Sequence, residues 1–261
     1  MKTLRWLIDL HPEFPASEIV AGYLRQHKKI EPIVIDRDDV MLGRWPDTED
    51  WIVGYGTMFA MTRLLRHPPL STAIFDDYSS LRCSKYYSYI YPFLGRAFLF
   101  APFGALPNLP LQRMFGDNIF VRSDTNYKLF PAEVLKTQEL SHWVKTFSHH
   151  QNELAVVSEV VSFEAEYRCF CRNGIFFCGS SYPDEPYSEV PQEIRSVAES
   201  VAQALDVTGM NMLTVDIGIH AGEPKLVEIG GVNSWGIYGS NVADFIAAME
   251  EEAVDRWEDL I

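Results

Sequence analysis

Two runs of alternating apolar and polar residues near the C-terminus, residues 214–220 and 224–230, flank a short loop centred on Gly222. Alternation with a period of two is typical of half-buried strands, and a short loop with a glycine joins such strands into a β-hairpin. If Gly222 is the middle of the turn, Asp216 lies directly opposite Glu228. Facing side chains in a hairpin are roughly 4.5–5.5 Å apart at Cβ, and like charges at that distance repel.

The pair Asp216 and Glu228 has two interpretations. Two facing carboxylates are stable only if one is protonated or if a cation lies between them. Mg²⁺ suits this position, because it is usually held by one or two carboxylates together with substrate phosphates. Alternatively, the hairpin presents a solvated outer face on which the two acids never meet. The spacing alone leaves both interpretations open.

The N-terminal part of the chain alternates between strand-like and helix-like patterns. Apolar runs bounded by turn residues predict three strands, and periodic apolar positions predict two helices between and after them. This β-α-β-β-α order predicts an α/β domain with a partly parallel sheet. The predicted elements are strands over 4–10, 31–40 and 50–56, and helices over 16–29 and 57–66. The glycines near residue 55 either make a tight strand-to-helix turn or offer backbone N–H groups to an anion.

The C-terminal part shows a different mixture of elements. Asn173-Gly174 is a preferred two-residue turn between two alternating runs and predicts a second hairpin over 166–179, with Arg168 facing Gly179. Apolar positions at helical spacing predict a helix over 190–205. The remaining predicted elements are strands over 118–123 and 154–161, and helices over 132–148 and 241–260.

A segment rich in proline and glycine, residues 101–110, separates these two parts. Such segments are typical of linkers. The sequence therefore predicts an N-terminal α/β domain over residues 1–110 and a C-terminal domain of α+β character over residues 111–261.

Composition narrows the possible partners and compartment. With 261 residues and 47% hydrophobic residues, the chain can bury one large core or two modest ones. A net charge of −14 disfavours a nucleic-acid partner, whose phosphates require cations. The N-terminus lacks the apolar core of a signal peptide, and no run approaches the ~18 apolar residues of a membrane span. We expect a soluble, cytoplasmic protein with no membrane partner and four free cysteines; the sequence predicts no oligomeric state.

The segments Val-Asp-Ile, Leu-Val-Glu-Ile and Asn-Ser-Trp-Gly-Ile-Tyr within residues 215–238 resemble the metal-binding end of the ATP-grasp superfamily. The resemblance is to its small branch of carboxylate–amine ligase-like proteins. It implies an ATP-grasp-like fold preceded by a pre-ATP-grasp α/β domain, with Asp216 and Glu228 holding Mg²⁺ and ATP. The family usually has a metal-binding Asn two residues after the Glu, where this chain has Gly230. We expect Asn233 to replace that ligand; the alternative is a loop amide that caps the following turn.

The same resemblance suggests which residues contact the nucleotide. A strand carrying a basic residue, followed by a lysine, contacts the phosphates in the family, which implies this role for Arg122 and Lys128. Glu159 and Val161 match the family's hinge, where backbone groups pair with adenine and a glutamate accepts from its amino group. Without the resemblance, the two cations are ordinary surface residues and Glu159 is one exposed acid on an apolar strand.

Glu166-Tyr-Arg168 resembles the family's Glu-x-Arg motif, whose arginine contacts the γ-phosphate or the acyl intermediate. The match implies that Glu166 belongs to the nucleotide site and that Arg168 is catalytic. An arginine suits this work because its fork of donors is bidentate and always charged. The implied activity is an ATP-dependent ligase that joins a carboxylate to an amine of a small molecule or peptide through an acyl phosphate. A nucleotide-binding protein without ligation and a phosphotransferase are the alternatives.

Overall fold

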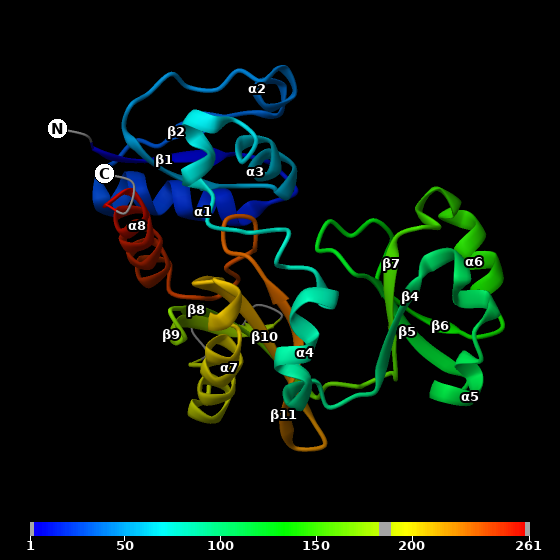
Figure 1. The fold of residues 1–261 in the computed structure, drawn as a ribbon. Helices are drawn as coiled ribbons and strands as arrows, with labels where there is room; N and C mark the ends of the chain where they lie inside the picture. Colours follow the sequence, from blue (N-terminus) through cyan, green and yellow to red (C-terminus); the bar gives the residue numbers. More distant parts are fainter. Residues whose placement is uncertain (1–2, 183–188, 259–261) are drawn as a thin grey trace. The chain divides into compact units, whose positions relative to one another are not determined.

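Three β-sheets organise the computed structural model, which describes residues 3–182 and 189–258 (Figure 1). The chain forms two compact units. Unit 1 comprises Met1–Asp76, Ala165–Ile217 and Glu228–Ile261, and unit 2 comprises Asp77–Glu164 and Gly218–Val227. The mixed α/β fold predicted from the sequence is confirmed.

A three-stranded parallel sheet forms the N-terminal part of unit 1. The strand β1 (Leu4–Asp9) lies between β2 (Ile33–Ile35) and β3 (Trp51–Tyr55). Both pairings are parallel, whereas the sequence predicted a partly parallel sheet. The helix α1 (Pro15–Tyr23) follows β1, and α3 (Met58–Leu64) follows β3. The last helix, α8 (Val242–Glu258), packs against α1 and β3, so the end of the chain completes the core begun at its start (Figure 1).

The predicted strand over 31–40 is wrong in its second half. The strand β2 ends at Ile35, and Asp36 begins the helix α2 (Arg37–Leu42). Asp36 and Asp39 form a capping box, in which each side chain accepts a hydrogen bond from the backbone N–H of the other. A capping box satisfies N–H groups that a new helix leaves without partners, which overrides the strand propensity of the preceding apolar run.

The second sheet has the order β11-β10-β8-β9, with β8 (Ala165–Arg172), β9 (Ile175–Tyr182), β10 (Met212–His220) and β11 (Glu223–Gly230). The turn at Asn173 and Gly174 has positive φ at both residues, as the predicted two-residue turn requires. A bulge between Phe170 and Cys171 shifts the register by one residue, so Arg168 pairs with Ser180. The predicted pairing of Arg168 with Gly179 is therefore wrong.

The turn between β10 and β11 is also shorter than predicted. Ala221 and Gly222 form it alone, with φ of 51° and 77°, and Glu223 is already the first residue of β11. A turn centred on Gly222 would need one more residue. The facing of Asp216 and Glu228 does not follow from the observed turn, and their relation rests on the contacts described below.

Unit 2 is built on an antiparallel sheet of order β4-β7-β5-β6. Its core lies where Ile119 and Val121 of β5 pack against α6 and the segment around Phe103. The predicted helix over 132–148 begins as a strand, β6, and the predicted strand over 154–161 ends at Ser158. The elements are α4 (Cys83–Leu94), β4 (Phe98–Pro102), α5 (Leu111–Phe115), β5 (Asn118–Ser123), β6 (Glu133–Lys136), α6 (Leu140–Thr146) and β7 (Leu154–Ser158).

The proline- and glycine-rich segment over residues 101–110 is part of unit 2. It ends β4 and forms a 3₁₀-helix, Phe103–Asn108, in which Phe103 and Leu106 are fully buried. The chain first passes from unit 1 to unit 2 between Asp76 and Asp77. The predicted boundary after residue 110 does not coincide with this point.

The helix α7 (Gln192–Ala204) and four further short helical segments complete the described chain: Leu24–Lys28, Pro68–Ala73, Ser148–His150 and Asp206–Thr208. All four cysteines are buried free thiols, as expected. In the part of the chain that is described, no helix is both long and apolar enough to cross a membrane.

Candidate active site

Arg168 and Asp216 form a two-pronged ion pair in unit 1. The Nε of Arg168 donates to Oδ1 of Asp216 at 2.9 Å, and its Nη2 donates to Oδ2 at 2.7 Å. The side chains are only 11% and 14% exposed. Bidentate pairing of this kind fixes the orientation of the guanidinium as well as its distance. The predicted catalytic residue and a predicted metal ligand are thus direct neighbours.

The remaining contacts of Arg168 come from the loop that follows β11. Its Nη1 donates to the carbonyl oxygen of Gly236 at 3.1 Å, and the guanidinium lies 4.5 Å from the ring centroid of Tyr238. Tyr238 has a φ of 46°, which is rare for a bulky residue. Such backbone strain persists only where the surroundings hold it, and it concentrates at functional sites.

The two predicted metal ligands both act on Arg168. Burial disfavours its charged form, but the hydrogen bonds and charge of Asp216, followed by Tyr238 and Glu228, outweigh burial and raise the pKa of Arg168 above its ordinary value. Glu228 is therefore within electrostatic reach of the same guanidinium as Asp216. Asp216 is 14% exposed and therefore does not lie on a solvated outer face, and the cation that it contacts in the structure is Arg168.

Glu166 precedes Arg168 by two residues on β8, which places it on the same face of the sheet. Burial, and next the charge of Asp216, raise the pKa of Glu166, while Arg168 opposes the shift. Glu166 therefore belongs to the same electrostatic cluster.

The donor set fits Mg²⁺ only in partnership with a substrate. Among residues 3–182 and 189–258, no group of three or more His, Cys, Asp or Glu side chains is arranged to hold a metal ion. Asp216 and Glu228 supply hard oxygen atoms, the kind of donor that Mg²⁺ prefers. Two carboxylates completed by phosphate oxygens and water is the usual environment of protein-bound Mg²⁺.

The contacts of Asn233 argue against its predicted role as a third ligand. Asn233 is fully buried, and its Oδ1 accepts from the N–H groups of Phe75 at 2.6 Å and Asp76 at 3.1 Å. Its Nδ2 donates to the carbonyl oxygens of Gly54 and Ala73. Both lone pairs of the amide oxygen are used, so none is left for a metal.

Gly230 occupies the position where the resemblance led us to expect an asparagine, and packing leaves no room for a side chain there. A Cβ built on Gly230 would lie 2.2 Å from the indole of Trp235, far inside van der Waals contact. The Trp235 ring therefore occupies the space that a side chain at position 230 would need.

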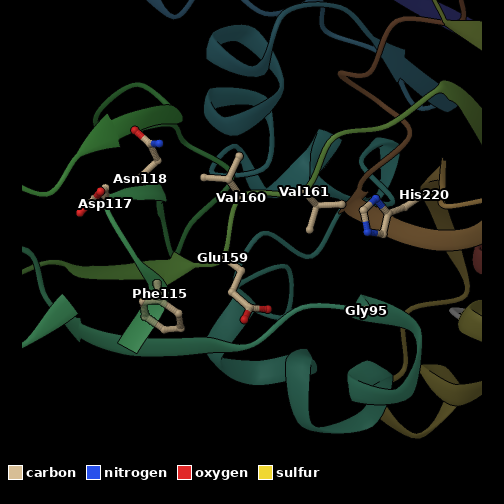
Figure 2. Close-up of a pocket in the computed structure, with 8 residues that line it drawn as sticks. All are labelled: Gly95, Phe115, Asp117, Asn118, Glu159, Val160, Val161 and His220. Carbon is tan, nitrogen blue, oxygen red and sulfur yellow. The ribbon is translucent and has the colours of Figure 1, made fainter. Parts of the chain in front are cut away.

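Unit 2 holds a separate pocket of about 440 Å³ (Figure 2). It contains two of the residues predicted for the hinge, Glu159 and Val161. One oxygen of the Glu159 carboxylate accepts from the N–H of Ala97 at 2.9 Å, and the Glu159 N–H donates to the Ala97 carbonyl. The pocket is lined by Gly95, Phe115, Asp117, Asn118, Glu159, Val160, Val161 and His220.

The two predicted phosphate contacts differ sharply in environment. Arg122 lies on β5 and is 7% exposed, and its Nη2 donates to Oδ1 of Asn126 at 3.3 Å. Lys128 is exposed, has a φ of 49°, and forms no ion pair with a residue that the structure describes. Its left-handed backbone is unusual for lysine, which costs roughly 1–2 kcal/mol.

The resemblance located the loop that follows β11, but sequence reasoning missed its contacts with Arg168. Neither Tyr238 nor Gly236 carries a local signal, because a positive φ at tyrosine and a backbone carbonyl acceptor leave no trace in a residue pattern. Ser180 was missed for a similar reason: its hydroxyl is fully buried across from Arg168 without a hydrogen-bond partner among the described residues.

Comparison with known proteins identifies the class of this fold and then the family. Residues 93–248 match the family model of the ATP-grasp domain, R2K clade family 2, and the chain belongs to that family. The predicted membership of the ATP-grasp superfamily is confirmed. No curated protein matches the sequence.

Several solved structures share the fold over nearly the whole length of both chains. D-cycloserine synthetase DcsG matches at 12% identity with a TM-score of 0.63, covering 96% of this chain and 99% of that one. A RimK domain ATP-grasp protein from Sphaerobacter thermophilus matches at 11% identity and 0.64, covering 97% and 100%. The ATP-grasp ligase PsnB, solved with a minimal precursor, Mg and ADP, matches at 13% identity and 0.58, covering 97% and 99%. At these identities the likeness shows a shared fold.

Proposed function

We propose that the protein is an ATP-dependent carboxylate–amine ligase that uses Mg²⁺. The observation that carries the proposal is the cluster in which Arg168 is held by Asp216 within reach of Glu228. Its support is the family: the chain has an ATP-grasp domain, and proteins of the same fold include ligases.

The residues of unit 1 are assigned to the reacting phosphate. Asp216 and Glu228 would hold Mg²⁺, which when bound supplies positive charge to the phosphate oxygens. Arg168 would stabilise the charge that develops as the phosphoryl group moves. Glu166, in the same cluster, would belong to the nucleotide site. Because Arg168 is already oriented by Asp216 and Gly236, it needs no reorganisation at the moment of reaction.

The residues of unit 2 are assigned to the nucleotide. The pocket beside Glu159 and Val161 would take the adenine, with the second oxygen of Glu159 accepting from the exocyclic amine. A pocket of this size falls within the ordinary range for small ligands. Arg122 and Lys128 would compensate phosphate charge.

The proposed reaction has two steps. An oxygen of the substrate carboxylate attacks the γ-phosphorus of ATP, which releases ADP and forms an acyl phosphate. The nitrogen of an amine then attacks the acyl carbon, inorganic phosphate leaves, and the amine loses a proton. Catalysis consists of positioning and charge stabilisation, and no side-chain nucleophile takes part.

The test is a screen of amino acids, singly and in pairs, and of short peptides with ATP and Mg²⁺. ADP release and product mass are measured together. ADP release with an amide product supports the ligase. A stable phosphorylated product would instead indicate a phosphotransferase, and nucleotide binding without ADP release would indicate a binding protein.

The metal assignment is tested with Asp216→Asn, which keeps the shape of the side chain and one oxygen acceptor. We expect turnover to fall by at least about 10²-fold, the scale of losing a key electrostatic group, and ATP affinity to lose its dependence on Mg²⁺. ATP affinity that is Mg²⁺-dependent to the same degree in both proteins would remove Asp216 from the site.

A further inference from the structure

The loop over residues 230–238, which supplies the Gly236 and Tyr238 contacts to Arg168, is tied to the N-terminal part of unit 1. Asn233 makes the largest number of these ties. Its side chain bonds to the backbone of Gly54, Ala73, Phe75 and Asp76, at 2.6–3.2 Å, and its own carbonyl oxygen accepts from the N–H of Gly56 at 3.0 Å. A fully buried side chain bonded to two separate segments fixes the loop to both of them.

Asp76 also holds the loop, because its carboxylate accepts hydrogen bonds from backbone N–H groups of the loop. Its carboxylate is 3% exposed and accepts from the N–H groups of Val232 at 2.5 Å and Asn233 at 3.2 Å. A Cβ on Gly231 would lie 2.2 Å from this carboxylate, so only glycine allows the approach. Consecutive N–H groups that converge on one anion form a rigid backbone arrangement.

Tyr55 holds the loop next to the residue that contacts Arg168. Its fully buried hydroxyl donates to the carbonyl oxygen of Trp235 at 2.8 Å, and Trp235 packs on Gly230. The following carbonyl, that of Gly236, accepts from Arg168. The Tyr55 hydroxyl is therefore one residue away from the acceptor that orients the guanidinium.

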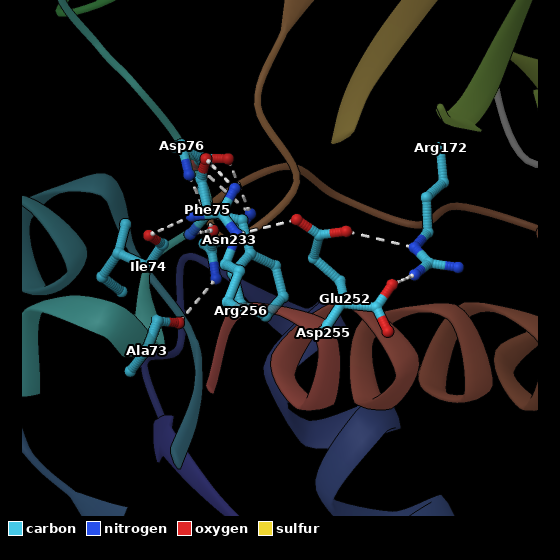
Figure 3. Close-up of polar contacts among 9 residues, drawn as sticks. All are labelled: Ala73, Ile74, Phe75, Asp76, Arg172, Asn233, Glu252, Asp255 and Arg256. Atoms are coloured by element: carbon cyan, nitrogen blue, oxygen red, sulfur yellow. Dashed lines mark hydrogen bonds and ion pairs between the residues drawn. The ribbon is translucent and has the colours of Figure 1, made fainter. Parts of the chain in front are cut away.

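The segment that Asn233 binds is itself anchored (Figure 3). Arg256 of α8 donates to the carbonyl oxygens of Ile74 and Phe75 at 3.4 and 3.2 Å. Glu252, 3% exposed, accepts from Arg256 at 2.7 Å and from Arg172 at 3.1 Å. Arg172 lies on β8, the strand that carries Arg168, so the bonds form a closed circuit that begins and ends on one strand.

We infer that Tyr55, Asp76 and Asn233 are positioning residues, which fix the loop over residues 230–238 so that its Gly236 carbonyl and Tyr238 ring hold the Arg168 guanidinium against Asp216. In the described part of the chain, Tyr55 and Asn233 make no hydrogen bond with Arg168, and all three residues hydrogen-bond to the loop. The region around the N-terminal sheet thus sets the geometry of the ion pair between Arg168 and Asp216. That this geometry serves catalysis rests on the proposed function.

The inference is tested with Tyr55→Phe, which removes only the bond to Trp235. Ser17→Ala is the matched control, because Ser17 is also buried in unit 1 and its hydroxyl donates to the carbonyl oxygen of Phe14 at the same 2.8 Å, far from the loop in the chain. Both variants should lose similar thermal stability. We expect Tyr55→Phe to lower kcat by about tenfold with little change in the KM for ATP, and Ser17→Ala to leave kcat unchanged. Equal kcat values for the two variants would overturn the inference.

A double-mutant cycle separates positioning from an independent effect. If Tyr55 acts through Arg168, Tyr55→Phe should have almost no further effect on kcat in an Arg168→Lys background. The full tenfold loss in that background would show that Tyr55 acts elsewhere, and the inference would then fail.

A readout that needs no turnover keeps the inference distinct from the proposed function. Phenylglyoxal modifies arginine, and mass spectrometry measures its rate at Arg168 in the intact protein. The rate should rise several-fold in Tyr55→Phe and more in Asn233→Ala, but not in Ser17→Ala. If wild type shows no ligase activity yet these rates follow the expected order, the proposed function fails and the positioning stands. If the enzyme is an active ligase but these modification rates are unchanged, the proposed function stands and the positioning inference fails.

Discussion

Arg168 in unit 1 and Lys128 in unit 2 are both proposed to contact phosphate groups of the nucleotide, yet their environments in the structure are opposite. Arg168 is buried and hydrogen-bonds to the carboxylate of Asp216 and the carbonyl of Gly236. Lys128 is exposed and forms no ion pair within the described part of the chain. The first cation is oriented by the protein in advance, whereas the second has to be ordered when a ligand binds.

This difference separates two kinds of contribution. An oriented, buried cation acts on charge that develops in the reaction without paying for reorganisation. A flexible surface cation loses side-chain entropy on binding, so its net contribution to affinity is small. We therefore expect Arg168 to affect mainly the rate, and Lys128 to make only a small contribution to nucleotide affinity.

The largest effect is expected from Arg168→Lys. A lysine keeps the charge but cannot bridge both oxygens of Asp216 and the Gly236 carbonyl in one plane. We expect kcat to fall by roughly 10²-fold and ATP affinity to change much less. Steady-state kinetics and equilibrium ATP binding measure the two separately. Equal losses in both would make Arg168 an ordinary ground-state contact.

Gly230→Asn tests whether the cluster tolerates the family's usual residue. Because the new Cβ would collide with the Trp235 indole, we expect a loss of about 1–3 kcal/mol in the free energy of unfolding. Gly222→Asn is the control: that glycine has open space around it and a positive φ that asparagine tolerates. Chemical denaturation compares the two variants. Stability equal to wild type together with stronger Mg²⁺ binding would restore position 230 as a ligand site.

Local patterns predicted most of the elements that build the cluster. Alternation located β10 and β11, and Asn173-Gly174 located the hairpin that carries Arg168. The register was less accessible, because the bulge between Phe170 and Cys171 lies outside the turn from which the pairing was predicted. The strand over 31–40 failed for a local reason that was visible in the sequence: Asp36 and Asp39 have the spacing of a capping box.

The role of Asn233 could not be read from the sequence at all. Its partners, Gly54 and the segment over residues 73–76, are more than 150 positions away along the chain. A buried amide with four backbone partners and a loop amide facing a metal look identical in one dimension. The resemblance to the family located the loop, but only the fold shows which way the side chain turns.

Lys128→Gly tests the contribution of the exposed cation of unit 2 to ATP affinity. Loss of the charge should weaken ATP binding by about tenfold or less, since one exposed ion pair contributes up to roughly 1 kcal/mol. Glycine also relieves the left-handed backbone, so the protein should become slightly more stable rather than less. Calorimetry and thermal unfolding measure both, with Lys145→Ala as the control for removing an exposed charge on α6. Unchanged ATP affinity at low salt would take Lys128 out of the site.

The smallest effect concerns Glu166 and the pH dependence of stability. Its pKa is raised in the folded protein, first by burial and then by Asp216, so folding favours the protonated form. The stability that this gives is fully present below the unfolded pKa of about 4.3 and is lost as pH rises through the higher folded pKa. Glu166→Gln should therefore match wild type near pH 4 and be more stable near pH 7. The gain should stay below about 1 kcal/mol, because Glu166 is only partly buried and solvent screens its charge.

Glu223→Gln provides a contrast of opposite sign, since the hydrogen bond to Lys225 lowers the pKa of Glu223. Thermal unfolding of both variants across this pH range measures the difference. A Glu166→Gln variant that loses stability at pH 7 would mean that the charged carboxylate is held by Arg168 more strongly than burial and Asp216 oppose it.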